Sequence, residues 1–162
     1  MAKPAGPSAF EGAVEVVRTI VPDDLGPFKA GGHRWGMKLW FGQQPVVPKF
    51  HYEAQLLGGK HVGKGVTVAI EVGFHAEHAD DGENERLLAG LVAAEKKWRK
   101  ALGPDAVAGP FLGRASWRRL SETWIDPDLG QPELGFEVAA RLVDYAAALE
   151  PILRALPPPD RV

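Results

Sequence analysis

Cysteine is absent from this chain of 162 residues, and its absence excludes several kinds of chemistry. The chain can form no disulfide, no thiolate zinc site and no cysteine nucleophile, so the cytoplasm is the expected compartment. It also lacks an apolar run of about 18 residues, which argues against a transmembrane helix and a membrane partner. The opening stretch MAKPAGPSAF has no apolar core, so we expect no signal peptide.

An excess of positive charge is lacking as well. The 19 basic and 21 acidic side chains give a formal net charge of −2, so nucleic-acid binding would need a local basic patch. The P-loop, the dinucleotide-binding glycine motif and the serine nucleophile elbow do not occur, which argues against nucleotide hydrolysis by a familiar route. The length fits a single domain, residues 1–162, with a loop-like start (1–7) and a proline-rich tail (157–162).

Apolar residues at helical spacing predict helices at both ends of the chain and in its middle. The predicted helices cover residues 8–21, 80–102 and 132–150. A capping box, formed by Ser8 and Glu11, opens the first helix. Pro151 ends or kinks the last one.

Alternating apolar and polar residues predict three strands, over residues 34–41, 50–57 and 66–74. Their short connections favour an antiparallel meander. Residues 23–33 read as a turn-rich connection, and residues 106–113 as a returning strand. The segment that follows either extends this strand or forms another hairpin arm. The predicted fold is therefore α+β: helix, three-stranded antiparallel meander, helix, strand region and C-terminal helix.

The polar positions of the three strands fall on one face of the predicted meander. They are Lys38 on the first strand, His51, Glu53 and Gln55 on the second, and Glu71 and His75 on the third. Two carboxylates on neighbouring strands, joined by imidazoles, can hold a hard divalent cation such as Mg²⁺ or Mn²⁺. The alternative is a solvated sheet face with cross-strand ion pairs such as Lys38 with Glu53.

The stretch IEVGFHAEH, residues 70–78, ends in two histidines and a glutamate. On a strand His75 and Glu77 share a face while His78 points away, and the spacing is not that of the H-E-x-x-H zinc motif. Gly73 indicates a bulge or the close approach of another backbone or a ligand. Packing of a helix or of Trp40 against Gly73 is the alternative.

Two basic segments, KKWRK (96–100) and RASWRR (114–119), each contain a tryptophan. Both could bind phosphates, with the tryptophan stacked on a base. A solvated helix end is the alternative for the first segment, because lysines there complement the helix dipole. Arg118 and Arg119 are the stronger candidates, since neighbouring residues on a strand point in opposite directions and only one can be buried.

The segments HYEAQ, IEVGF, NERLLAGLVAAEKKW and WRRL, together with the element order over residues 8–149, resemble the restriction-endonuclease-like superfamily, and within it small bacterial domains of unknown function. The resemblance implies a divalent-metal site with Glu53 and Glu71 as its carboxylates and a lysine two positions after the second. Gly73 stands where that lysine is expected. Gln55 follows Glu53 in the same pattern, one strand early, and Lys38 could supply the cation from the neighbouring strand.

Two functions follow from these features. The first is a non-catalytic module that binds a protein, a ligand or nucleic acid, in keeping with the incomplete motif and a pI of about 6.2. The second is a metal-dependent nuclease or phosphodiesterase. Its catalytic residues would be Glu53, Gln55, Glu71 and Lys38, its metal ligands Glu53, Glu71 and His75, and its phosphate-binding residues Arg118 and Arg119. A third, weaker idea is a small-molecule pocket between the sheet and the last helix, lined by Trp40 and Trp124.

Overall fold

A computed structural model describes residues 8–111 and 113–158 of the chain, and a six-stranded antiparallel sheet forms its centre, with the strand order β1-β2-β3-β4-β6-β5. The strands are β1 (Phe28–His33), β2 (Gly36–Phe41), β3 (Phe50–Gly58), β4 (Val68–Ala76), β5 (Val107–Phe111) and β6 (Arg114–Ile125). The predicted α+β class is confirmed, and the predicted three-stranded meander is part of a larger sheet.

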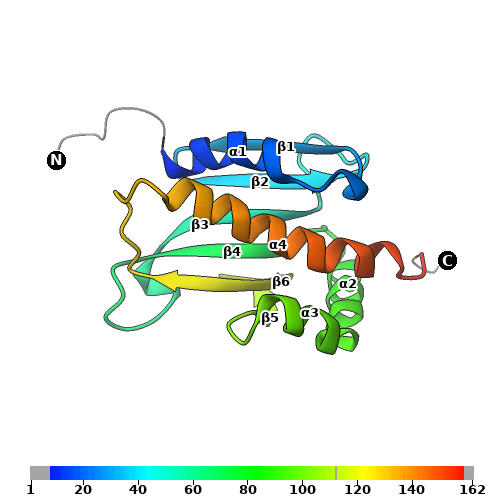
Figure 1. Ribbon diagram of the computed structural model, residues 1–162. Coiled ribbons are helices and arrows are strands. Elements are labelled where there is room, and N and C mark those ends of the chain that lie inside the picture. The colour runs from blue at the N-terminus through cyan, green and yellow to red at the C-terminus, as the bar shows by residue number, and fades with distance from the viewer. Residues whose placement is uncertain (1–7, 112, 159–162) are drawn as a thin grey trace.

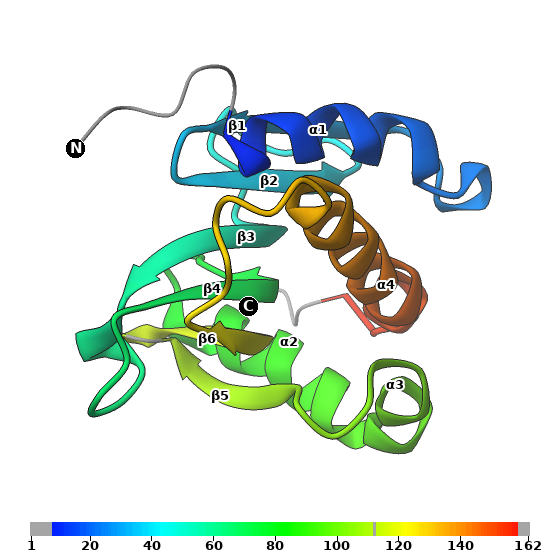
Figure 2. The ribbon, with the colours of Figure 1, turned by 60° about the vertical axis from the view of Figure 1, so that its left-hand side comes forward.

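Helices α1 (Ala9–Ile20) and α4 (Leu134–Arg154) contact each other and cover one face of the sheet (Figure 1). Helices α2 (Asp81–Ala93) and α3 (Glu95–Leu102) pack against α4, and α2 also contacts β6 (Figure 2). The main core lies between this face and the helices. It contains, among others, Val17, Leu39, Tyr52, Phe74 and Leu142, each at most 1% exposed. None of the helices in the described part of the chain is long and apolar enough to cross a membrane.

The capping box at the start of α1 is confirmed. The Glu11 backbone N–H donates to the Ser8 hydroxyl at 3.3 Å, and the Ser8 backbone N–H donates to the Glu11 carboxylate at 3.1 Å. These two bonds satisfy donors that a helix start leaves without partners. The helix ends before Pro22, as predicted.

The prediction of a turn-rich connection over residues 23–33 is wrong for its second half, because Phe28–His33 forms β1. This glycine-containing segment has little strand propensity of its own. It becomes a strand by pairing with all of β2 and by packing under α1. At Gly32 a Cβ atom would lie 2.8 Å from a methyl group of Val14, so the close packing of α1 requires a residue without a side chain there.

The predicted middle helix is two helices, α2 and α3, separated at Ala94. The Leu91 carbonyl accepts from the Ala94 N–H at 3.0 Å and from the Trp98 indole N–H at 2.7 Å. In a continuous helix this carbonyl would instead accept from residue 95. The buried Trp98 side chain therefore stabilises the break. The predicted end at Gly103 is confirmed, with the Gly103 N–H donating to the Arg99 carbonyl.

The region after residue 105 forms a hairpin, because β6 pairs with β5 on one side and β4 on the other. This decides between the two alternatives left open for that segment. The final helix α4 continues through Pro151 to Arg154, so Pro151 does not end it. The turn after Pro151 stays helical because Ile152 and Leu153 pack against the core.

Candidate metal centre

The register of β2, β3, β4 and β6 brings the predicted polar positions onto one face, opposite the helices. Lys38 pairs with Glu53, and His51 pairs with His75. The centre of this face is not solvated, because His51 and His75 are at most 1% exposed. The ion pair predicted between Lys38 and Glu53 is present at 4.0 Å, but it lies at the rim of a buried polar cluster.

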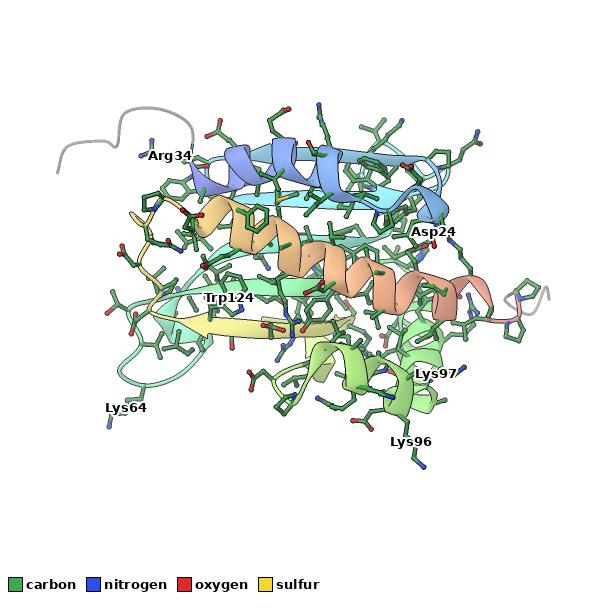
Figure 3. The ribbon with its side chains drawn as sticks, in the orientation of Figure 1. Asp24, Arg34, Lys64, Lys96, Lys97 and Trp124 are labelled. Carbon is green, nitrogen blue, oxygen red and sulfur yellow. The ribbon has the colours of Figure 1, made fainter. Side chains whose placement is uncertain are left out.

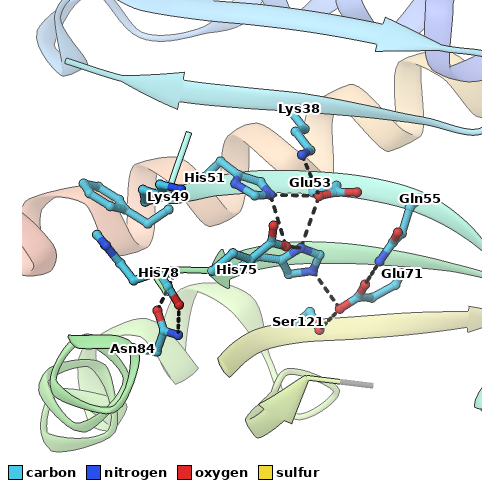
Figure 4. A network of polar contacts seen from close by, with 12 residues as sticks. Lys38, Lys49, His51, Glu53, Gln55, Glu71, His75, His78, Asn84 and Ser121 are labelled. Atoms are coloured by element: carbon cyan, nitrogen blue, oxygen red, sulfur yellow. Dashed lines mark hydrogen bonds and ion pairs between the residues drawn. The ribbon is translucent and has the colours of Figure 1, made fainter. Parts of the chain in front are cut away.

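Four side chains, from β3, from β4 and from the residue directly after β4, converge at the centre of this face. We call them the four-residue cluster: His51, Glu53, His75 and Glu77. Glu53 Oε1 lies 2.8 Å from His51 Nε2 and 3.3 Å from His75 Nδ1 (Figure 4). Glu77 Oε2 lies 3.6 Å from His51 Nε2 and 3.4 Å from His75 Nδ1.

These four atoms have the spacing of ligands around one ion. All lie within 4.8 Å of one another. Zinc bonds of about 2.0–2.2 Å to nitrogen and oxygen imply separations of about 3.3–3.6 Å between tetrahedral ligands. Three of the four contacts above fall in this range, at 3.3, 3.4 and 3.6 Å, and the fourth, from His51 to Glu53, is a hydrogen bond of 2.8 Å. His75 Nδ1 is buried and makes no hydrogen bond of good geometry, although it points at two carboxylates. Once Nδ1 has lost its proton, its lone pair is therefore placed to bind a metal ion.

Glu71 holds His75 from the opposite side of the ring. Its Oε2 lies 2.9 Å from His75 Nε2 and accepts a 2.6 Å hydrogen bond from Ser121, while Gln55 donates to its Oε1 at 2.7 Å. Metal-binding histidines commonly contact a carboxylate through their second nitrogen, which orients the ring and raises its basicity. The Glu71–His75 pair has this arrangement (Figure 4).

The electrostatics of the cluster couple these groups tightly. Burial opposes a charge on His75, but the attraction of Glu71 and contacts with Glu53, Glu71 and Glu77 raise the pKa of His75 well above its usual value. Burial likewise opposes a charge on Glu71, but His75, Ser121 and Gln55 lower the pKa of Glu71 to about 2. In spite of burial, His51 and His75 hold the pKa of Glu53 far below its usual range. Without a metal, Glu53 and Glu71 are thus ionised on either side of an imidazolium at His75.

Aromatic side chains of the β5–β6 hairpin cover part of the cluster. The Phe111 ring meets His75 edge to face, with centroids 4.7 Å apart, and Trp117 packs against Phe111 in the same way at 5.5 Å. The register between β5 and β6 shifts at Pro110 and Phe111, as in a bulge that redirects a side chain. This cover explains why polar groups on a sheet face without a helix over it are buried.

The residues predicted to bind metal or act in catalysis come together only in part. Glu53 and Glu71 contact different nitrogens of His75, so the imidazole separates the two carboxylates. Gln55 donates to Glu71, and Lys38 is adjacent to Glu53. Glu71 therefore contacts the ring of His75 from the side away from the cluster, and Gln55 contacts Glu71. Neither residue would touch an ion held by the four-residue cluster.

Glu77 belongs to the cluster but is not among the metal ligands predicted from the sequence. It lies one position beyond the end of β4, and its N–H still donates to the Lys49 carbonyl, which keeps the strand geometry. The sequence does carry a signal for it: the tripeptide H-x-E occurs twice, as His51-Tyr52-Glu53 and as His75-Ala76-Glu77. On two paired strands this repeat brings four ligands to one face.

His78 and Gly73 lie close in the sequence to the residues of the cluster. His78 points away from the cluster, as predicted, and stacks on Phe50. At Gly73 a Cβ atom would lie 2.4 Å from the Leu120 carbonyl and 2.5 Å from the Cα of Ser121. The expected close approach of another backbone is therefore that of β6. No lysine fits at Gly73 without displacing this strand.

The two arginines predicted to bind phosphate already have partners. Arg118 contacts Glu85 at 2.7 Å and Asp81 at 3.1 Å. Arg119 donates to the Ser121 hydroxyl at 2.8 Å. A phosphate would have to displace these contacts, so phosphate binding by Arg118 or Arg119 stays a prediction. Trp40 and Trp124 lie on opposite faces of the sheet and therefore do not line one pocket, because Trp124 packs against the main core and Trp40 follows the polar positions of β2.

Comparison of the chain with family models, with curated proteins and with solved structures gave no match.

Proposed function

We propose that this chain is a non-catalytic module that binds a divalent transition-metal ion through the four-residue cluster. The observation that carries the proposal is the convergence of two imidazole nitrogens and two carboxylate oxygens within 4.8 Å. Support comes from the buried His75 Nδ1, which faces the two carboxylates without a good hydrogen bond. Glu71 further supports it, because its carboxylate contacts the ring of His75 and is itself held by a hydrogen bond from Ser121.

The ligand types indicate which ion fits. Mg²⁺ and Ca²⁺ prefer all-oxygen sites with many ligands, whereas imidazole suits Zn²⁺ and related transition metals. Two of the four cluster ligands are imidazoles, so we favour Zn²⁺ over Mg²⁺ or Mn²⁺. Four protein ligands and side chains at most 13% exposed match structural zinc sites, whereas catalytic sites keep a position for water.

The nuclease alternative and the restriction-endonuclease-like resemblance stay proposals. Both require Glu53 and Glu71 to bind one ion, and the structure has His75 between these two carboxylates. Cleavage of plasmid DNA that needs Mg²⁺ or Mn²⁺ and is abolished by Glu71→Gln would favour this alternative. A protein or nucleic-acid partner remains part of the same proposal, because a metal-stabilised module of this size can carry a binding surface. A cytoplasmic location likewise stays a proposal.

The direct test measures metal content. The protein is loaded with Zn²⁺, dialysed against metal-free buffer and analysed by mass spectrometry of the elements, with Mg²⁺ loading in parallel. We expect one Zn²⁺ per chain, little Mg²⁺, and loss of Zn²⁺ in His75→Ala. His61→Ala is the matched control, since His61 is exposed in the short 3-10 helix Gly59–His61, outside the cluster.

A second variant distinguishes the loss of a metal ligand from the loss of the fold. Glu77→Gln removes one ligand charge at the end of a strand, and circular dichroism records whether the fold is retained. A folded Glu77→Gln protein with weakened Zn²⁺ binding supports the proposal. Wild-type protein without Zn²⁺, or His75→Ala with undiminished Zn²⁺, would contradict it.

A further inference from the structure

A pocket opens beside the four-residue cluster, at its Glu53 edge. It has a volume of about 290 Å³. Lys38, Trp40 and Glu53 line it from the sheet, and the segment Val46–Pro48 lines it from the loop between β2 and β3. Glu53 belongs to both the pocket and the cluster, so a molecule in the pocket would lie directly beside the metal ligands.

The loop wall of this pocket is held in place by one side chain. The Gln44 amide donates to the Phe50 carbonyl at 2.9 Å, and its oxygen accepts from the Lys49 N–H at 3.0 Å. Gln44 therefore ties the start of the loop to its end. With its ends tied together, the loop that carries Val46 and Val47 loses less conformational freedom when a ligand binds.

Charge indicates what the pocket can accept. Lys38 Nζ lies 4.0 Å from Glu53 Oε1, an oxygen of the cluster. A divalent ion in the cluster would bind Glu53 and weaken the attraction between Glu53 and Lys38, which leaves the ammonium of Lys38 available to an anion in the pocket. Lys38 and the exposed imidazole of His33 are the basic side chains among the residues that line the pocket. One ammonium group favours a monoanion over a phosphate dianion, which gains most from several donors.

The apolar walls of the pocket indicate what the uncharged part of the ligand is like. Trp40 is half-buried, and Val46 and Val47 are 97% and 62% exposed. Exposed valines next to a tryptophan offer apolar surface that a ligand would bury with a gain of free energy. The pocket thus combines one cation with an apolar rim, which fits an organic carboxylate with a small apolar body.

We propose that this pocket binds a small monoanionic carboxylate, with the carboxylate on Lys38 and the apolar body against Trp40, Val46 and Val47. We further propose that the bound metal strengthens this binding, a claim that rests on the function proposed above. The reason is that Lys38 lies 4.0 Å from the Glu53 carboxylate, and a metal ion bound to the same oxygen would weaken this contact. By linkage, the carboxylate strengthens metal binding to the same extent.

The test uses benzoate, butyrate and inorganic phosphate as ligands. Each is titrated into the full-length Zn²⁺-loaded and metal-free proteins, with the indole signals of uniformly ¹⁵N-labelled protein as the readout and Trp40→Phe to assign the Trp40 signal. We expect benzoate to shift the Trp40 signal, to bind at least about five-fold more tightly with Zn²⁺, and to bind more tightly than phosphate. Lys38→Gln should weaken benzoate binding at least about ten-fold, and Lys96→Gln should leave it unchanged. Lys96 extends into solvent from α3, far from the pocket (Figure 3).

The two proposals fail in different ways. Zn²⁺ content is measured before any anion is added, so absence of metal counts against the proposed function alone. Zn²⁺-loaded protein that binds neither carboxylate, or that binds benzoate equally well after Lys38→Gln, overturns the pocket proposal and leaves the metal site standing. Tighter binding of phosphate overturns the choice of a monoanion. Equal benzoate affinity with and without Zn²⁺ overturns the coupling.

Discussion

His51 and His75 lie directly opposite each other on β3 and β4, with their imidazole rings edge to face and the ring centroids 5.5 Å apart. Each histidine begins an H-x-E tripeptide. Because the strands are antiparallel, the two glutamates lie on opposite sides of the histidine pair. This separates the two negative charges, which reduces their repulsion, and leaves the space between the four side chains for a cation.

Metal binding is expected to release a proton. The pKa of His75 is raised well above its usual value in the metal-free protein, so the ring is protonated at neutral pH, whereas a metal ligand must be neutral. Isothermal titration of Zn²⁺ at about pH 7 in buffers of different ionisation enthalpy should show release of about one proton per ion. A binding enthalpy independent of the buffer would contradict this.

Glu71→Gln is expected to weaken Zn²⁺ binding without abolishing it. The substitution keeps the shape but removes the charge that faces His75 Nε2, and loss of such an outer partner typically costs about 10- to 100-fold in metal affinity. Competition with a chelator measures the affinity. Glu122→Gln is the control, because Glu122 is also buried but binds Arg141 and Tyr145 on the helix side of β6. Unchanged affinity in Glu71→Gln would show that Glu71 does not support the site.

The metal-free protein is expected to lose stability as the pH rises above neutrality. The raised pKa of His75 gives a stabilisation that is complete below the unfolded-state value of 6.5 and is lost as the pH rises through the folded-state pKa. The pKa of Glu71, lowered from 4.5 to about 2, gives a stabilisation that is present above 4.5 and lost as the pH falls towards 2. These two groups therefore favour the window between about pH 4.5 and 6.5.

Urea unfolding in the presence of a chelator measures this dependence. Above pH 6.5 the free energy of unfolding should fall by at most about 1.4 kcal/mol per pH unit. The fall should be smaller in His75→Gln, which has no group to deprotonate there. Wild-type protein that is more stable at about pH 8.5 than at about pH 5.5 would refute the expectation.

Gly73→Ala is expected to destabilise the fold, whereas Gly31→Ala is not. A Cβ at Gly73 would lie 2.4 Å from the Leu120 carbonyl, but one at Gly31 meets nothing within 4 Å. Crowding in a packed interior typically costs about 1–3 kcal/mol, and an open surface position changes stability by about 0.5 kcal/mol or less. Chemical unfolding of both variants gives the comparison. Equal stabilities would mean that β6 can move away at no cost.

The period-two pattern of the strands was sufficient to predict the polar face and most of its residues. It could not predict that the face is buried, because Phe111 reaches His75 only through a register shift between β5 and β6. It also gave no preference between Glu71 and Glu77 as the second carboxylate. That choice depends on which nitrogen of His75 each one meets, which is a property of side-chain orientation.

The errors in the fold have a related cause. β1 has a sequence typical of a turn and is a strand because β2 and α1 surround it. The break between α2 and α3 follows from one indole N–H that bonds to the Leu91 carbonyl. Both depend on tertiary contacts that override local propensity. The capping box of α1 was predicted correctly because it is local to Ser8 and Glu11.

All four ligands belong to a single hairpin, β3–β4, with residues 59–67 as its connection. A slip of one residue in strand pairing turns every side chain of a strand to the other face. Such a slip here would move one H-x-E tripeptide to the apolar, helix-covered side and separate the ligands into two pairs. A bound ion would therefore act as a check on strand alignment, because only the correctly paired hairpin can hold it.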